Sequence, residues 1–112
     1  FHSSLMKPAA EQLRVRLQAV EFAVPQIPVL NNVDVAIETD GHRIRDALVR
    51  QAYAAVRWVE CVRAIQASGL VDVVECGPGK VLAGLSKRID ATLSGWPLFD
   101  PVSLTQVKEQ LV

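Results

Sequence analysis

A valine-rich stretch that ends in two glycines places the strongest constraint on the fold. Residues 71–76 read Val-Asp-Val-Val-Glu-Cys, and Gly77-Pro78-Gly79 follows at once. Valine favours strands, and a Gly-Pro-Gly sequence ends them in a tight turn. Behind the turn, residues 80–93 carry apolar side chains every three or four positions, which predicts a helix packed through Val81, Leu82, Leu85 and Ile89. A strand, a tight turn and a helix in this order predict an α/β fold with parallel pairing.

The rest of the chain alternates helical segments with short strands. Helices are predicted at residues 4–20, 43–53 and 56–68, and a last helix behind a capping box at residues 103–106. A short strand is predicted at residues 29–30, and residues 96–99 are predicted to form a short strand or an extended segment. Periodicity leaves open whether residues 33–37 extend the strand at 29–30 or form a rim segment. The predicted class is α/β, with helices packed on a short parallel sheet. No linker divides the 112 residues into two domains.

Composition and charge exclude several classes of partner. Twelve basic and twelve acidic side chains cancel, so net charge gives no reason to expect binding to nucleic acid or to an anionic membrane. No apolar run approaches the roughly 20 residues needed to span a bilayer, and no signal peptide is recognisable. We therefore expect a cytoplasmic protein without membrane or nucleic-acid partners.

The two cysteines, Cys61 and Cys76, fall in different predicted elements, one in a helix and one at the end of a strand. Their spacing to His2 and His42 is not that of a metal site. Free cysteine is most often interior. Both thiols are thus predicted to be reduced, buried and structural, and no metal is expected.

The glycine turn also invites a nucleotide-binding interpretation, because a strand, a glycine loop and a helix form the usual cradle for phosphate. Gly79 and Gly84 have the P-loop separation, but Leu85 stands where the phosphate-binding lysine belongs. The dinucleotide pattern fails too, since Leu82 replaces the third glycine. The sequence favours a tight turn with a close approach of the backbone.

His2 is the best candidate for acid/base chemistry, because histidine exchanges a proton near neutral pH. It stands just before the first predicted helix. No nucleophile with a recognisable local motif follows it. The chain is therefore interpreted as the base-carrying part of a larger protein.

Two polar groups leave alternatives open. The pair Asn31-Asn32 is predicted to satisfy turn backbone, with substrate binding as the alternative. One face of the predicted helix at residues 43–53 is charged, which is typical of a solvated surface but also suits contacts with phosphate groups. That face carries Arg43, Arg45, Asp46 and Arg50.

Three separated motifs together resemble a known family. In chain order they are Phe1-His2-Ser3-Ser4-Leu5-Met6, Asn31-Asn32-Val33 and Glu75-Cys76-Gly77-Pro78-Gly79-Lys80-Val81-Leu82. The set resembles the C-terminal third of malonyl-CoA:acyl-carrier-protein transacylases, across essentially the whole chain. Acyltransferase domains of polyketide and fatty-acid synthases share the pattern, and remain an alternative to a free-standing enzyme.

The resemblance implies a fold and a place within it. Residues 1–112 would be the C-terminal portion of a hydrolase-like large α/β subdomain, whose sheet is completed by upstream strands. A smaller ferredoxin-like subdomain and the part that bears the nucleophile would also lie upstream, outside this chain.

The resemblance further implies malonyl transfer in fatty-acid biosynthesis, from coenzyme A to acyl carrier protein through an acyl-serine. His2 matches the catalytic histidine of the family, and the main-chain carbonyl at Gln51 matches the group that orients it. The expected partners are malonyl-CoA, the carrier protein and the upstream remainder of the enzyme, with coenzyme A thioester as substrate and no cofactor. Because the serine would lie upstream, the isolated chain is expected to be inactive.

Phe1 matches the residue that faces the acyl pocket in similar acyltransferases, where phenylalanine accompanies malonyl selection. The alternative is that Phe1 is only a core residue. A second alternative for the whole chain, from another class, is a non-catalytic binding module that docks through the charged helix face.

Overall fold

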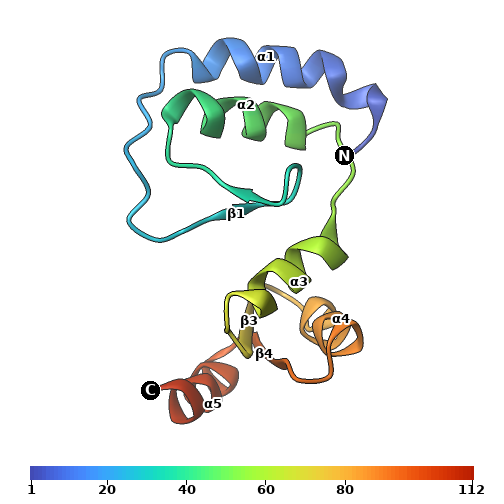
Figure 1. Cartoon of the computed structure of the whole chain (residues 1–112), viewed down its shortest axis with the longest axis vertical. Coiled ribbons are helices and arrows are strands. Elements are labelled where there is room, and N and C mark those ends of the chain that lie inside the picture. Colours follow the sequence, from blue (N-terminus) through green and yellow to red (C-terminus); the bar gives the residue numbers. More distant parts are fainter. The chain divides into compact units, whose positions relative to one another are not determined.

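The computed structural model describes all residues 1–112, and the chain forms two compact units, Phe1–Cys61 and Val62–Val112 (Figure 1). The boundary falls inside a continuous helix, α3 (Trp58–Ala67). The assignment of residues 1–112 to one subdomain stays a prediction.

Two helices form the frame of the first unit. The predicted helix at residues 4–20 is a 3₁₀ turn, η1 (Ser4–Met6), followed by α1 (Lys7–Leu17), and it ends three residues early. α2 (Gly41–Gln51) lies beside α1 and runs in the opposite direction (Figure 1). Asp40 caps α2 as predicted, since its carboxylate accepts hydrogen bonds from the amides of His42 and Arg43.

The charged face of α2 takes part in packing. The Arg45 guanidinium donates to the carbonyls of Leu17 and Val20 at 2.8 and 3.0 Å, which supplies donors to the free carbonyl end of α1. It also lies over the Phe22 ring, 5.5 Å from its centre. Arg45 thus holds α2 against the end of α1, while Arg43 points outward with 74% of its side chain exposed.

A tight hairpin completes the first unit. β1 (Leu30–Asn31) pairs antiparallel with β2 (Ala36–Ile37), so the short strand predicted at residues 29–30 does not join a parallel sheet. The Asn31 side chain organises the turn: its amide donates to the Ala36 carbonyl, and its oxygen accepts from the amides of Val33 and Asp34. The turn role predicted for Asn31 is therefore confirmed.

An ion-pair cluster ties this hairpin to α2. Arg50 donates to both carboxylate oxygens of Asp34, at 2.7 and 2.6 Å, and to Asp46 at 2.6 Å. Hydrogen bonding from Arg50 is the main cause that holds the pKa of Asp34 below its ordinary value, and the positive charges of Arg50 and Arg57 add to it. In turn, the carboxylates raise the pKa of Arg50, which stays charged.

The second unit contains the short parallel sheet. β3 (Asp72–Cys76) pairs with β4 (Ser94–Leu98) in parallel, from Asp72 opposite Ser94 to Cys76 opposite Leu98. The connection runs through α4 (Val81–Ile89), which packs on both strands, and α5 (Pro101–Leu111) packs on β4. The predicted class, helices packed on a short parallel sheet, is confirmed.

The glycine turn after β3 does not present a free phosphate cradle. The Glu75 carboxylate accepts a hydrogen bond of 2.8 Å from the Ala83 amide, in the first turn of α4. A carboxylate therefore already lies where a bound phosphate would meet the positive end of the helix. This contact supports the preference for a structural turn over nucleotide binding.

Two predictions about side chains in this unit are corrected. Asp100, not Ser103, caps α5: Ser103 is the third residue of the helix and completes the capping box with Asp100. Cys76 is exposed, because it is the last residue of β3, whereas Cys61 is buried and burial raises the pKa of its thiol.

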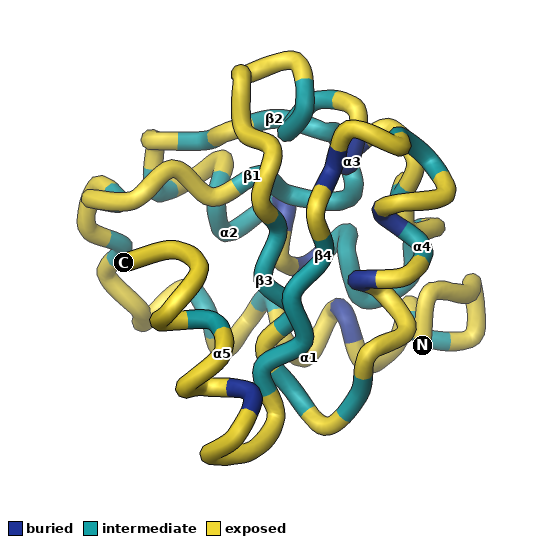
Figure 2. Tube along the Cα trace, turned by 90° about the horizontal axis from the view of Figure 1, so that it is seen from below, coloured by how far each residue is buried: buried dark blue, intermediate teal, exposed yellow.

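Fully buried residues are few and occur in both units (Figure 2). The largest fully buried side chains are Leu93, Val49 and Val62. Many large apolar side chains remain exposed, among them Phe1, Leu5, Ile27 and Val81. No helix has the length and apolar character needed to cross a membrane.

The close approach of backbone that the sequence placed at the glycine turn occurs at Gly95 in β4. A Cβ atom there would lie 2.4 Å from the Ala83 carbonyl oxygen, which is main chain of α4 and has little freedom to move.

Gly95→Ala should therefore lower the free energy of unfolding by about 1 to 3 kcal/mol. Gly84→Ala is the matched control: a Cβ at this exposed helical position meets nothing within 4 Å, and a gain of about 0.5 to 1 kcal/mol is expected. Urea denaturation measures both, and equal effects would contradict the packing.

The Asp34 pair predicts a pH dependence of stability. Because the pKa of Asp34 lies below its ordinary value of 3.8 in the folded protein, the stability it adds is complete above that value and is lost as the pH falls through the lowered pKa. Asp34→Asn should therefore be less stable than the wild type at neutral pH, and the difference should shrink as the pH falls below 3.8 and through the lowered pKa of Asp34. Urea denaturation along a pH series measures this difference, and a constant gap would contradict the assignment.

Candidate active site

The backbone of His2 is fixed against the segment that follows α2. Its amide donates to the Ala52 carbonyl at 3.0 Å, and its ring nitrogen Nδ1 lies 3.1 Å from the Ala54 carbonyl oxygen. His2 adopts a left-handed conformation with φ of 58°, which is uncommon outside glycine but less so for histidine. Two main-chain carbonyls therefore set both the position and the ring orientation of this residue.

The contact with Ala54 defines the state of the imidazole. A carbonyl oxygen only accepts hydrogen bonds, so Nδ1 carries the hydrogen and donates it. In the neutral ring the other nitrogen, Nε2, then has a free lone pair. Such a histidine is prepared to take a proton at Nε2, while the carbonyl stabilises the charged ring that results.

The resemblance implied that the main-chain carbonyl at Gln51 orients His2, a role that stays a prediction, whereas the contact seen in the structure is with another carbonyl. The hydrogen bond of the ring goes to Ala54, three residues beyond Gln51. α2 ends at Gln51, and the chain continues through a turn in which the Arg50 carbonyl accepts from the amides of Tyr53 and Ala54, at 3.1 and 2.9 Å. This turn brings the Ala54 carbonyl, rather than a carbonyl within α2, to the imidazole.

The three predicted site residues nevertheless come together around one cavity. It has a volume of about 320 Å³ and mostly apolar walls, formed by Phe1, His2, Leu13, Leu17, Leu48, Gln51 and Ala52. Gln51 lies in the wall, and Phe1 is 90% exposed at its edge. The structure thus places Phe1 and His2 beside a hollow large enough for a small acyl group, with α1 and α2 behind it.

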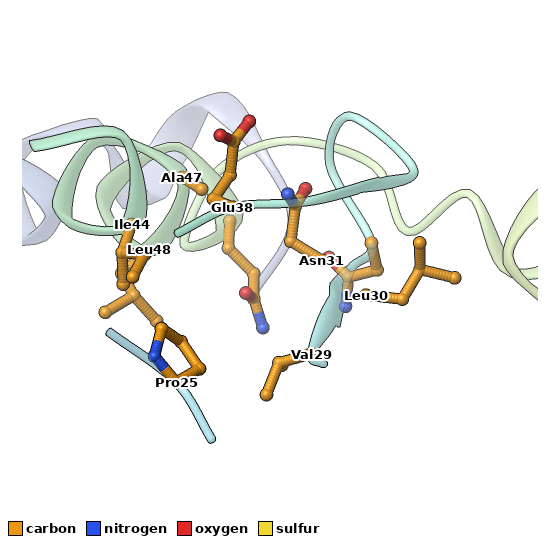
Figure 3. Close-up of a pocket in the computed structure, with 10 residues that line it drawn as sticks. Pro25, Val29, Leu30, Asn31, Glu38, Ile44, Ala47 and Leu48 are labelled. Atoms are coloured by element: carbon orange, nitrogen blue, oxygen red, sulfur yellow. The ribbon is translucent and has the colours of Figure 1, made fainter. Parts of the chain in front are cut away.

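A second cavity, of about 380 Å³, lies between α2 and β1 and shares Leu48 and Gln51 with the first. Figure 3 shows Ile44, Ala47 and Leu48 of α2 on one side and Val29 and Leu30 on the other. Its walls are mainly apolar. Asn32 also contributes to the lining, and its side-chain oxygen is buried without a hydrogen-bond partner.

Sequence reasoning missed the two alanines that hold His2. Ala52 and Ala54 act through their carbonyls, and a main-chain group leaves no trace in residue type. The signal available was indirect: a helix C-terminus has carbonyls without intrahelical donors, and such carbonyls accept hydrogen bonds from elsewhere. Such free carbonyls lie at the end of α2, but residue type does not tell which of them faces the ring.

Comparison with known proteins identifies the family. A malonyl CoA-acyl carrier protein transacylase of Salmonella typhimurium is 50% identical over 109 residues, which cover 97% of this chain and 35% of that protein. The crystal structure of an acyl-carrier-protein S-malonyltransferase from Burkholderia pseudomallei is 56% identical, with a TM-score of 0.91 over 97% of this chain and 36% of the other.

A malonyl-transacylase solved in complex with a type II PKS acyl-carrier protein is 51% identical, with a TM-score of 0.92 over 97% of this chain and 35% of the other. No family model matches the chain. The family that the three motifs predicted is nonetheless confirmed: in sequence and fold, the chain corresponds to about 35% of the length of a malonyl CoA-acyl carrier protein transacylase.

Proposed function

We propose that this chain is the histidine-bearing part of a malonyl-CoA:acyl-carrier-protein transacylase of fatty-acid biosynthesis, in which His2 is the general acid and base. The observation that carries the proposal is the His2 ring itself. Its Nδ1 is held by the Ala54 carbonyl, so that Nε2 is free beside the cavity. The similarity to malonyl transacylases over 97% of the chain supplies the substrate class.

The proposed reaction proceeds in two symmetrical halves. Nε2 of His2 takes the proton of a serine hydroxyl from the upstream part of the enzyme, and the serine oxygen attacks the thioester carbonyl of malonyl-CoA. The carbon–sulfur bond breaks, and the imidazolium returns its proton to the departing thiol of coenzyme A. In the second half, the thiol of the carrier protein gives its proton to Nε2 and its sulfur attacks the carbonyl of the acyl-serine. The ester carbon–oxygen bond breaks, malonyl-carrier is released, and the imidazolium returns the proton to the serine oxygen.

In this mechanism the Ala54 carbonyl takes the place that a carboxylate has in a Ser-His-Asp triad. It fixes the tautomer and stabilises the imidazolium without adding a full negative charge. Gln51 contributes to the cavity wall, and we assign the orienting role to Ala54. The serine, the group that binds the malonyl carboxylate and the oxyanion-hole donors are proposed to lie upstream, so the 112 residues alone should transfer no malonyl.

The alternative classes have less support. A docking module would use the charged face of α2, but Arg45 and Arg50 are engaged in contacts within the unit. The relatives at about 50% identity are named as transacylases. We therefore propose that the enzyme is a cytoplasmic malonyl transferase with acyl carrier protein as its partner. One relative was solved in complex with its acyl-carrier protein.

The role of His2 is tested in the full-length enzyme. His2→Ala should slow formation of the acyl-serine from labelled malonyl-CoA by about 10² to 10⁴-fold, the usual loss on removal of a general base. His42→Ala removes the other histidine, which lies in the first turn of α2, and should leave the rate unchanged. A normal burst of acylation in the folded His2→Ala enzyme would remove His2 from the mechanism.

Acyl selection by Phe1 is a separate expectation. An aromatic ring at the edge of the cavity leaves less room for the branch methyl of methylmalonyl. Phe1→Ser in the full-length enzyme should therefore raise kcat/KM for methylmalonyl-CoA relative to malonyl-CoA, by about 10-fold, near the lower limit for discrimination by a methylene-sized group. Phe99→Ser in the second unit is the matched control. An unchanged ratio in the folded Phe1→Ser enzyme would show that Phe1 does not limit the acyl pocket.

A further inference from the structure

A short series of hydrogen bonds connects the Asp34–Arg50 pair to His2. The connection runs through the main chain of Arg50 and Ala54. The Arg50 guanidinium donates two parallel hydrogen bonds to the Asp34 carboxylate and a third to Asp46, with donor–acceptor distances of 2.6 to 2.7 Å. About one third of each side chain in the Asp34 pair is exposed, 35% for Asp34 and 31% for Arg50. A planar fork on a carboxylate fixes direction as well as distance, which a single lysine contact does not.

The main chain of the same arginine supports the segment that holds the imidazole. The Arg50 carbonyl accepts from the amides of Tyr53 and Ala54. The Ala54 carbonyl is the group that accepts from Nδ1 of His2. Arg50 therefore connects two sets of contacts: its side chain is fixed to the hairpin, and its carbonyl fixes the turn that orients His2.

The hairpin end of this path is itself held in an unfavourable conformation. Val35, next to Asp34, has φ of 57°, and a β-branched residue in the left-handed region is an outlier. Such strain persists only where the surroundings determine it, and it is typical of functional sites. Asn31 supplies three hydrogen bonds to this turn, and the Arg50 fork supplies the contact that reaches α2.

We propose that Asp34 and Arg50 are positioning residues for the transfer reaction, which lock the end of α2 so that the Ala54 carbonyl stays against the His2 imidazole. The proposal rests on the proposed role of His2 as general base. The last turn of a helix frays readily because its carbonyls lack intrahelical donors. An anchor from the hairpin to the last turn of α2 opposes fraying at the one place where it would release the imidazole.

If the Asp34–Arg50 pair positions His2, the effect of its mutation on the acylation rate should depend on the presence of His2. If the pair is purely structural, the effect should be the same with and without His2. In the full-length enzyme, Asp34→Asn should slow acyl-serine formation by about 10- to 100-fold, the scale of a misplaced catalytic group, with little change in KM for malonyl-CoA. In the His2→Ala background, Asp34→Asn should have no further effect, because the carbonyl then has no imidazole to orient.

Arg50→Lys gives an independent test, since it keeps the positive charge but not the planar fork. It should slow acylation in the wild-type background and not in the His2→Ala background. Glu11→Gln is the matched control: it removes one carboxylate from an arginine pair on α1, that of Arg14, and should leave the acylation rate unchanged. Thermal unfolding of every variant establishes that the enzyme compared is folded.

The outcomes separate the two proposals. Wild-type acylation by folded Asp34→Asn and Arg50→Lys, with a slow His2→Ala enzyme, would overturn the role of the pair and leave that of His2 intact. An equal fractional loss in both backgrounds would also overturn it, because the pair would then act without His2. Normal acylation by His2→Ala would contradict the proposed function, and the positioning role with it.

Discussion

The hydrogen bond from Nδ1 of His2 to the Ala54 carbonyl is the interaction on which the proposed function of the first unit depends. A free imidazole has two tautomers and rotates about its side-chain bonds, so only a fixed acceptor makes Nε2 the basic nitrogen at a defined place. A neutral carbonyl performs this task at lower electrostatic cost than a partly buried carboxylate, which would have to be desolvated. A main-chain acceptor, however, is only as well placed as the segment that carries it, so the position of the ring depends on the segment that follows α2.

The first unit is built to place that segment. α1 and α2 pack side by side, Arg45 holds the end of α1, and Arg50 holds the hairpin to the end of α2. The charged face of α2 therefore supplies internal order, although its composition suggests a solvated surface. In the second unit, the parallel strands and α4 pack so closely at Gly95 that no side chain fits. Few side chains in either unit are fully buried, and many apolar side chains remain exposed.

Local sequence signals predicted the elements well where the contacts that form them are local. The valine-rich strand, its glycine turn and the Asp40 cap were evident from residue type and spacing, and the alternation of helices and strands predicted parallel pairing. Features made by contacts distant in sequence were not. The antiparallel hairpin, the fork between Asp34 and Arg50 and the carbonyl at Ala54 depend on how separate segments meet, and no periodicity encodes that. The cap of α5 was misplaced by three residues because both Asp100 and Ser103 suit an N-terminus.

The state of the His2 imidazole in the full-length enzyme tests the central claim most directly. Nitrogen-15 NMR of histidine-labelled enzyme, compared with His2→Ala to assign the signals, distinguishes a protonated ring nitrogen from one with a free lone pair. In the neutral ring, we expect a protonated Nδ1 and an unprotonated Nε2. A neutral His2 with the hydrogen on Nε2, or one that exchanges equally between the two tautomers, would contradict it.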